Sequence, residues 1–168
     1  RVLFRSAQLQ VLRPDLRFVE LRGNIQTRLG KVPGEGSIVM AVAALQVLGL
    51  TVRVAERFDV DVFVPSPGQG CVAVECRTGD DETAALVSSV DDRATRSAVE
   101  VERAFLAELG TGCSLPVGGH VSGGRLIGFL ADPHRAGDGA GLWWVRESVA
   151  LCGETRSEEH TSELQSRG

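Results

Sequence analysis

One amphipathic helix constrains the fold of this 168-residue chain more than any other feature. From Asp92 onward, apolar side chains recur at three- and four-residue steps, which gives the helix one apolar face: Ala94, Ala98, Val101, Phe105 and Leu109. Gly110 and Gly112 follow and predict its end. Two alternating segments come next, "GRLIGFLAD" and "GLWWVRESV", joined by the turn-rich "PHRAGDGA". A helix followed by an antiparallel hairpin predicts a small α+β unit.

The first half of the chain alternates between extended and helical patterns. Helix formers span residues 7–13, and "AALQVLGL" predicts another short helix. "RFVEL" alternates like a strand, and "SIVMAV" is a continuous apolar run typical of a buried parallel strand. Prolines and glycines in "DVFVPSPGQG" then predict a crossover or hinge, followed by the strand "CVAVECR" and the helix "DDETAALVSSV". This order indicates an α/β layer.

Composition argues against several classes of protein. The formal net charge of -4 is unlike that of a dedicated nucleic-acid binder. No apolar run reaches the length of a membrane span, and the start lacks the apolar region of a signal peptide. The four cysteines have no disulfide-framework spacing, which favours a reducing compartment. We therefore expect a cytoplasmic protein that binds neither nucleic acid nor membranes.

Cys113 lies between glycines in "GTGCSLPVGG", directly after the long helix. A thiol in such a loop is accessible, and accessibility permits covalent chemistry. The negative end of the helix disfavours the thiolate, so the position suits a permanent attachment better than a fast nucleophile. Spacing alone leaves an ordinary loop cysteine as the alternative.

Two arginines flank the turn "GNIQT" and form a candidate anion site. If Asn24 caps a short helix through Leu29, Arg22 and Arg28 could converge on one anion. Two solvated arginines in surface ion pairs are the alternative. Further along, "PGQG" could bring Gln69 and Gly70 close to a ligand, or it could be a simple linker.

The sequence offers no metal site. Cys71 and Cys76 are five residues apart on a predicted strand and so fall on opposite faces. His120 and His134 have no partners at ligand spacing. A cysteine hydrolase would need a histidine base, and His120 lies in a predicted glycine loop without an evident acid to orient it.

Four segments, in this order and spacing, resemble the porphobilinogen deaminase (hydroxymethylbilane synthase) family. They carry the motifs "LRGN..TRL", "GQG....ECR" and "ERAFL..L..GC..P.G" and span Leu12–Val32, Ala41–Leu50, Pro65–Arg77 and Glu102–Val121. The resemblance covers essentially all of residues 7–149.

The resemblance implies a transferase of tetrapyrrole (haem) biosynthesis. The family condenses four porphobilinogen molecules head to tail, releases ammonia at each step, and frees hydroxymethylbilane by hydrolysis. The growing pyrrole chain is anchored on a covalent dipyrromethane cofactor. The resemblance places the thioether anchor at Cys113 and cofactor or substrate contacts at Arg22, Asn24, Arg28, Gln69 and Gly70. It also implies a monomeric parent enzyme.

The chain departs from the family pattern at several positions. Val47 stands where the family usually has an arginine, and "VPGEGS" lacks the usual Asp-Ala. The family's twin arginines before Ala7 are replaced by "RVLFRS". This start and the tail "RSEEHTSELQSRG" can be encoded by opposite strands of one adapter-like DNA stretch, so we set residues 1–6 and 156–168 apart as non-native.

These features together predict a fragment of a three-domain enzyme. Residues 7–61 would be part of a second, periplasmic-binding-protein-like α/β domain, and 62–90 a crossover strand and helix belonging to a missing first domain. Residues 91–155 would form the third, cofactor-anchoring α+β domain with an antiparallel sheet. The catalytic aspartate would lie in the missing domain, so we expect the fragment alone to be inactive. A non-enzymatic anion-binding module of periplasmic-binding-protein type is the alternative.

Overall fold

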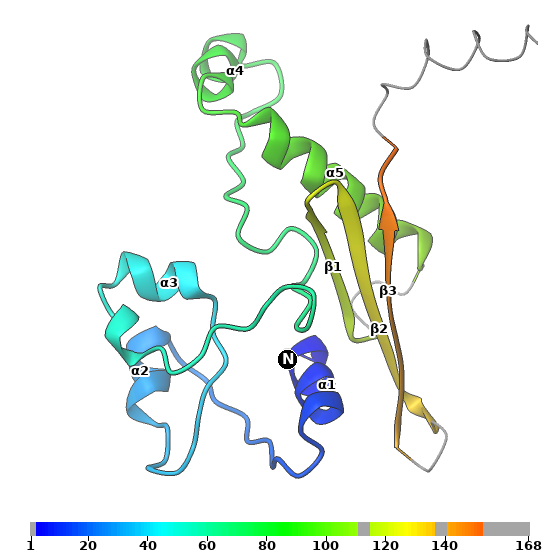
Figure 1. The fold of residues 1–168 in the computed structure, drawn as a ribbon. Helices are drawn as coiled ribbons and strands as arrows, with labels where there is room; N and C mark the ends of the chain where they lie inside the picture. The colour runs from blue at the N-terminus through cyan, green and yellow to red at the C-terminus, as the bar shows by residue number, and fades with distance from the viewer. Residues whose placement is uncertain (1–2, 111–114, 137–140, 153–168) are drawn as a thin grey trace, which may run out of the picture.

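The computed structural model describes residues 3–110, 115–136 and 141–152 (Figure 1). Five α-helices, one 3-10 helix and a three-stranded sheet make up the regular structure of these residues. In chain order the elements are α1 (Leu3–Leu12), α2 (Ile25–Gly30), α3 (Val42–Val47), η1 (Thr51–Arg53), α4 (Asp81–Ser88), α5 (Arg93–Glu108), β1 (Val117–Ser122), β2 (Arg125–Ala136) and β3 (Leu142–Ala150). Helices α1 to α3 lie to one side, while α5 runs across the sheet (Figure 1).

The sheet is antiparallel throughout, in the order β1-β2-β3. Gly123 and Gly124 form the two-residue turn between β1 and β2, with φ angles of 55° and 70°. A hairpin turn with positive φ at both positions matches the twist of the strands and favours glycine at each. The β2–β3 hairpin confirms the two strands predicted from the sequence.

Helix α5 packs on one face of the sheet through Phe105. Gly119 and Gly128 are direct partners across β1 and β2. A Cβ atom added at Gly119 would lie 3.0 Å from the Phe105 ring, and one at Gly128 would lie 2.9 Å from it. The two glycines therefore leave the flat slot that the ring needs. The predicted long helix is confirmed, with Asp92 as its N-cap and Leu109 as its C-cap.

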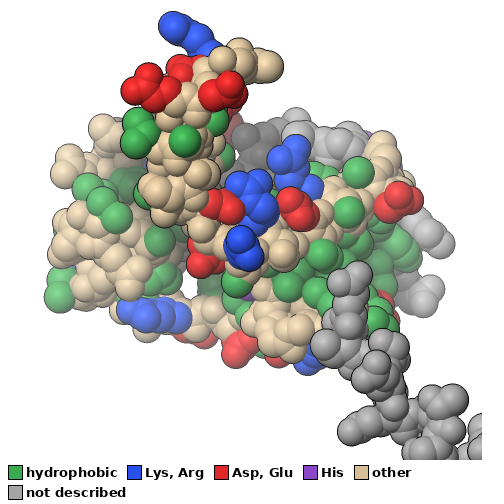
Figure 2. Space-filling view, turned by 90° about the horizontal axis from the view of Figure 1, so that it is seen from above, with side chains coloured by type: hydrophobic (Ala, Val, Ile, Leu, Met, Phe, Trp, Pro, Cys, Tyr) green, Lys and Arg blue, Asp and Glu red, His purple; other side chains and the backbone are tan. Residues whose placement is uncertain are grey.

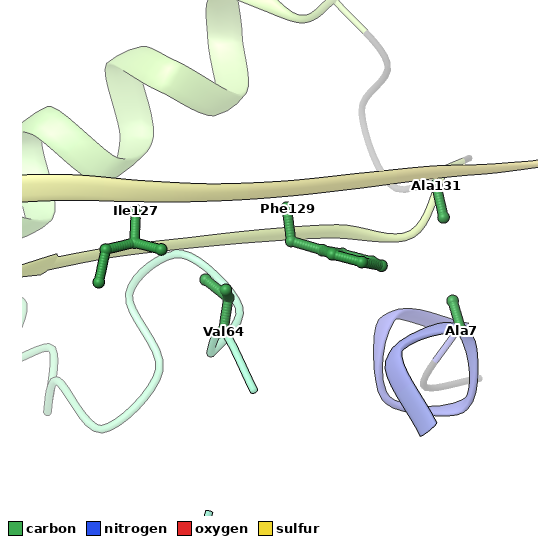
Figure 3. Packing of buried hydrophobic residues seen from close by; sticks show 5 residues of the cluster. All are labelled: Ala7, Val64, Ile127, Phe129 and Ala131. Carbon is green, nitrogen blue, oxygen red and sulfur yellow. The ribbon is translucent and has the colours of Figure 1, made fainter. Parts of the chain in front are cut away.

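The opposite face of the sheet carries the small hydrophobic core. Ile127, Phe129 and Ala131 project from β2 toward Val64 and toward Ala7 of α1 (Figure 3). Val64 and Ala131 are fully buried. Removing this apolar surface from water is the main force that holds the first half of the chain against the sheet.

Gln8 fixes α1 to the segment that carries Val64. Its side-chain oxygen accepts the Val64 N–H at 2.6 Å, and its side-chain nitrogen donates to the Val64 carbonyl at 2.8 Å. Gln8 is only 2% exposed, so this paired bond satisfies backbone groups that are hidden from water.

Three predicted strands are absent from the described residues. "RFVEL", "SIVMAV" and "CVAVECR" are irregular or extended, without ladder partners. A strand forms only where a neighbouring strand accepts its backbone hydrogen bonds, and among the described residues these segments have none. Conversely, the glycine-rich stretch predicted as a loop is β1. The described structure thus combines five helices with an antiparallel sheet, compatible with an α/β fragment.

Candidate functional site

Two guanidinium groups and one amide side chain form a candidate anion site: Arg5 of α1, Arg28 of α2 and Gln69 of the 65–70 loop (Pro65–Gly70). Arg5 of α1 donates to the Val39 carbonyl and to the Gln69 side-chain oxygen, both at 3.4 Å. Burial, and then the positive charge of Arg28, lower the pKa of Arg5. Arg28 on α2 is therefore close enough to Arg5 for their charges to repel.

Arg28 carries an orphaned polar group in this cluster. Its Nε atom is buried and has no hydrogen-bond partner among the described residues. Leaving a buried donor unpaired costs about 1–3 kcal/mol, and more for a charged group. A carboxylate is the group that best matches a guanidinium fork. Two neighbouring guanidiniums, one with an unpaired buried donor, therefore fit a carboxylate-bearing ligand.

The structure gives different surroundings to the two arginines that were predicted to converge. Arg22 pairs with Glu20 at 3.2 Å and its side chain is 83% exposed. Arg28 instead neighbours Arg5. Asn24 caps α2 as predicted, because its side-chain oxygen accepts the Thr27 N–H at 2.8 Å. The described contacts thus give Asn24 a structural role and give Arg22 the surface ion pair that was the alternative reading.

Gln69 and Gly70 lie in a tight turn. The Gln69 N–H bonds to the Ser66 carbonyl at 2.9 Å, and positive φ angles at Gly68 (72°) and Gly70 (93°) reverse the chain. Such angles are strained for residues with a Cβ atom. The loop therefore places the Gln69 side chain beside Arg5.

Cys113 lies outside the described residues. The helix before it ends as the sequence predicted, since Gly110 has a φ of 60° and donates its N–H to the Ala107 carbonyl. The other cysteines, Cys71, Cys76 and Cys152, are free and exposed. Within the described part of the chain, no group of three acidic, histidine or cysteine side chains could hold a metal ion.

His120 was predicted in a glycine loop without an orienting acid, and this was wrong on both points. It lies on β1, and its Nδ1 is 3.1 Å from Oε1 of Glu102. The glycines beside it suggested a loop, but close packing against Val64 and Phe105 requires them in the strand. Glu102 was not singled out, because an acid within an apolar helix pattern resembles an ordinary surface residue.

Arg5 was also missed, because residues 1–6 were set apart from the fold. A basic residue one turn before Gln8 was the available signal.

On the face shown in Figure 2, basic and acidic side chains are interspersed rather than gathered into one patch of a single sign. None of the described helices has the length and apolar character needed to cross a bilayer.

Comparison with known proteins gives two family matches. Residues 2–85 match the model described as "Porphobilinogen deaminase, dipyromethane cofactor binding domain". Residues 97–136 match the model described as "Porphobilinogen deaminase, C-terminal domain".

Individual relatives carry the same name. Proteins named porphobilinogen deaminase are 47% identical over 130 residues in Roseiflexus sp. (strain RS-1), 52% over 120 residues in Thermobifida fusca (strain YX) and 42% over 154 residues in Syntrophotalea carbinolica. These alignments cover 74%, 69% and 88% of this chain, but only 43%, 37% and 47% of the relatives. The chain therefore spans less than half the length of these relatives.

Proposed function

The chain belongs to the porphobilinogen deaminase family, and on this premise we propose that the full-length protein is a hydroxymethylbilane synthase. It would condense four porphobilinogen molecules head to tail with release of ammonia. The observation that carries this proposal is the Arg5–Arg28–Gln69 cluster, with its buried, unpaired Arg28 Nε. Each substrate pyrrole bears an acetate and a propionate, which are the carboxylates that such a cluster fits.

The residues present fit a dipyrromethane cofactor. Arg28, Arg5 and Gln69 would hold its carboxylates, and the Sγ atom of Cys113 would carry it through a thioether. When bound, the cofactor supplies the primer to which substrate units are added. A thioether suits this role because, unlike a thioester, it survives hydrolysis.

The arginines would bind and orient the carboxylates rather than move protons. A guanidinium stays charged even when its pKa is lowered, so Arg5 remains a cation in its half-buried position. Partial burial also lowers the local dielectric and strengthens attraction to an anion. A bidentate arginine fixes the plane of a carboxylate, and fixing the reacting groups in one orientation contributes to rate. The proposed binding set also keeps Arg22, Asn24 and Gly70 from the sequence-based prediction, and Arg22 would exchange its exposed pair with Glu20 for a ligand carboxylate.

We propose the domain division that the sequence suggested, with residues 3–6 added to its first segment because Arg5 bonds to Gln69 and the family match begins at residue 2. Residues 3–61 would belong to a periplasmic-binding-protein-like domain, 62–90 to a crossover into the first domain, and 91–155 to the third domain. Two observations support this division: the extended segment after Gly70 has exposed valines, and the family match changes between residues 85 and 97. The full-length enzyme would be a cytoplasmic monomer that binds neither nucleic acid nor membranes.

A mass measurement tests the anchor. A full-length relative, purified after expression, should carry the extra mass of a covalent dipyrrole, and replacing the cysteine aligned with Cys113 by serine should remove it. The cysteine aligned with Cys76, in the family motif "ECR", serves as the control, and its serine variant should keep the mass. Retention of the mass in the first variant would refute the anchor.

A second measurement separates an enzyme from an anion-binding module. The full-length relative should release ammonia from porphobilinogen, whereas the 168-residue chain alone should release none, because the proposed catalytic aspartate lies in the first domain. Reversible binding of porphobilinogen by the full-length protein, without turnover or covalent pigment, would favour the binding module.

A further inference from the structure

Glu102 is a buried carboxylate that bonds to three donors from two parts of the chain. It lies in α5 and is 4% exposed. Its Oε2 atom accepts the Gly68 N–H at 2.7 Å. Its Oε1 atom accepts the Val121 N–H at 2.8 Å and lies 3.1 Å from Nδ1 of His120.

The Oε1 contacts close the free edge of the sheet. Among the described residues β1 pairs with β2 alone, and it is therefore an edge strand. Its outward N–H groups bond elsewhere: Gly119 donates to the Pro65 carbonyl at 2.8 Å, and Val121 donates to Glu102. The 65–70 loop and Glu102 therefore cover this edge together, which satisfies donors that would otherwise be unpaired.

The Oε2 contact holds the loop itself. Gly68 directly precedes Gln69, whose side-chain oxygen accepts a hydrogen bond from the Arg5 guanidinium. The loop departs from regular structure at Gly68 and Gly70. Its own turn bonds, from the Gln69 N–H to the Ser66 carbonyl and from the Cys71 N–H to the Gly68 carbonyl, shape the turn but do not tie it to α5. A charged acceptor makes a stronger hydrogen bond than a neutral one. The bond from Gly68 to Glu102 thus ties the loop that carries Gln69 to the rigid α5–sheet unit.

We propose that Glu102 is a positioning residue for the anion site: it holds the 65–70 loop so that Gln69 stays beside Arg5. The consequence for catalysis rests on the function proposed above, whereas the loop tie does not. The hydrogen bonds of Glu102 in the described part of the chain go to Gly68, His120 and Val121, none of which is a proposed ligand-binding residue, so Glu102 would act through the loop.

The substitution Glu102→Gln tests this role at nearly constant volume. The amide keeps one acceptor oxygen, and the orientation that preserves both Oε1 contacts turns the NH2 group toward the Gly68 N–H. We expect amide hydrogen exchange at Gly68 and Gln69 to become at least about tenfold faster in this chain. Exchange in the β2–β3 hairpin should change much less. Glu100→Gln, an exposed change on the same helix, is the matched control, and His120→Phe should leave loop exchange unaltered.

Kinetics of a full-length relative give the second readout. The same change at the aligned glutamate should raise KM for porphobilinogen severalfold, with a smaller effect on kcat. A double variant that also replaces the glutamine aligned with Gln69 by alanine should raise KM little further, since both changes act on one contact. If the Gln variant does not fold, Glu102→Asp keeps the charge, shortens the reach by one methylene and should show a smaller shift in the same direction.

Three results would overturn the proposal: unchanged exchange at Gly68, faster exchange at all amides alike, or faster loop exchange with unaltered KM. A relative without deaminase activity before any substitution would instead refute the proposed function, and the exchange result would still decide the loop tie.

Discussion

At the scale of single residues, Arg28 combines features that a purely structural side chain avoids. Its Nε is buried without a partner among the described residues, and its positive charge lowers the pKa of another arginine, Arg5. Like charges close together destabilise a fold, and an unpaired buried donor adds to that cost. A local arrangement that opposes stability is typical of a binding site, where a ligand supplies the missing partner.

Substitution of Arg28 should therefore separate stability from binding. Arg28→Gln removes the repulsion of Arg5, so the thermal midpoint of the chain should stay equal to or rise above the wild-type value. Porphobilinogen should raise the wild-type midpoint by an amount that grows with the logarithm of its concentration above Kd, because a ligand that binds only the folded state stabilises it. This rise should disappear in the variant. Arg53→Gln, on exposed η1, should retain it. A variant that loses stability but keeps the ligand effect would contradict this reading.

At the scale of elements, α5 depends on two details of its surroundings: the glycine slot under Phe105 and the cap at Asp92. Neither feature includes a residue of the proposed binding set. Changes in either should therefore alter packing or helix stability rather than ligand chemistry.

Filling the slot should weaken the contact between α5 and the sheet. In Gly128→Ala the new Cβ would lie 2.9 Å from the Phe105 ring, and overpacking of this kind costs about 1–3 kcal/mol. Urea denaturation should show the loss. In a Phe105→Leu background the same change should cost much less, since the ring is gone. Gly30→Ala, which meets no atom within 4 Å, should be neutral. Equal costs in both backgrounds would argue against the slot.

The cap makes α5 sensitive to acid. The backbone N–H and then the side chain of Thr95 lower the pKa of Asp92 by bonding to its charged form. Because the folded pKa is below the unfolded one, the charge stabilises the helix above about pH 4 and loses this effect as pH falls through the folded pKa. Circular dichroism from pH 6 to pH 2 should show the stability of the wild type declining relative to Asp92→Asn, which keeps an acceptor but does not titrate. Parallel curves would contradict the prediction.

At the scale of the whole molecule, the sequence predicted elements that are stabilised locally and missed those that depend on distant partners. Helix α5, the caps at Asn24 and Asp92, and the β2–β3 hairpin follow from periodicity and local hydrogen bonds. Strand β1 was missed because its paired glycines resemble a loop, although Phe105 and Val64 require them. The hydrogen bonds that give Glu102 and Arg5 their proposed roles go to residues more than 15 positions away in the sequence.

A strand that was predicted but did not form also has a physical explanation. "CVAVECR" has the composition of a buried strand, yet Val72 is 84% and Val74 60% exposed. Together with α4 and the start of α5, this segment lines an open groove of about 750 Å³. A segment with strand composition but no strand partner is expected where the partner lies in another part of a longer chain, and the relatives are more than twice as long as the aligned region.

Replacing the two valines of this segment should then have different effects in this chain and in a full-length relative. In this chain, Val72→Ser with Val74→Ser should change the free energy of unfolding by less than about 0.5 kcal/mol, because exposed side chains contribute little. At the aligned positions of a full-length relative, the pair should cost at least about 2 kcal/mol, because buried valines lose packing and gain unsatisfied hydroxyls. Thr78→Ser, at the end of the same segment, serves as the control. Urea midpoints of both proteins provide the measurement. Equally small effects in the two proteins would show that the segment stays exposed in the longer one. That result would contradict the assignment of the segment as a crossover strand.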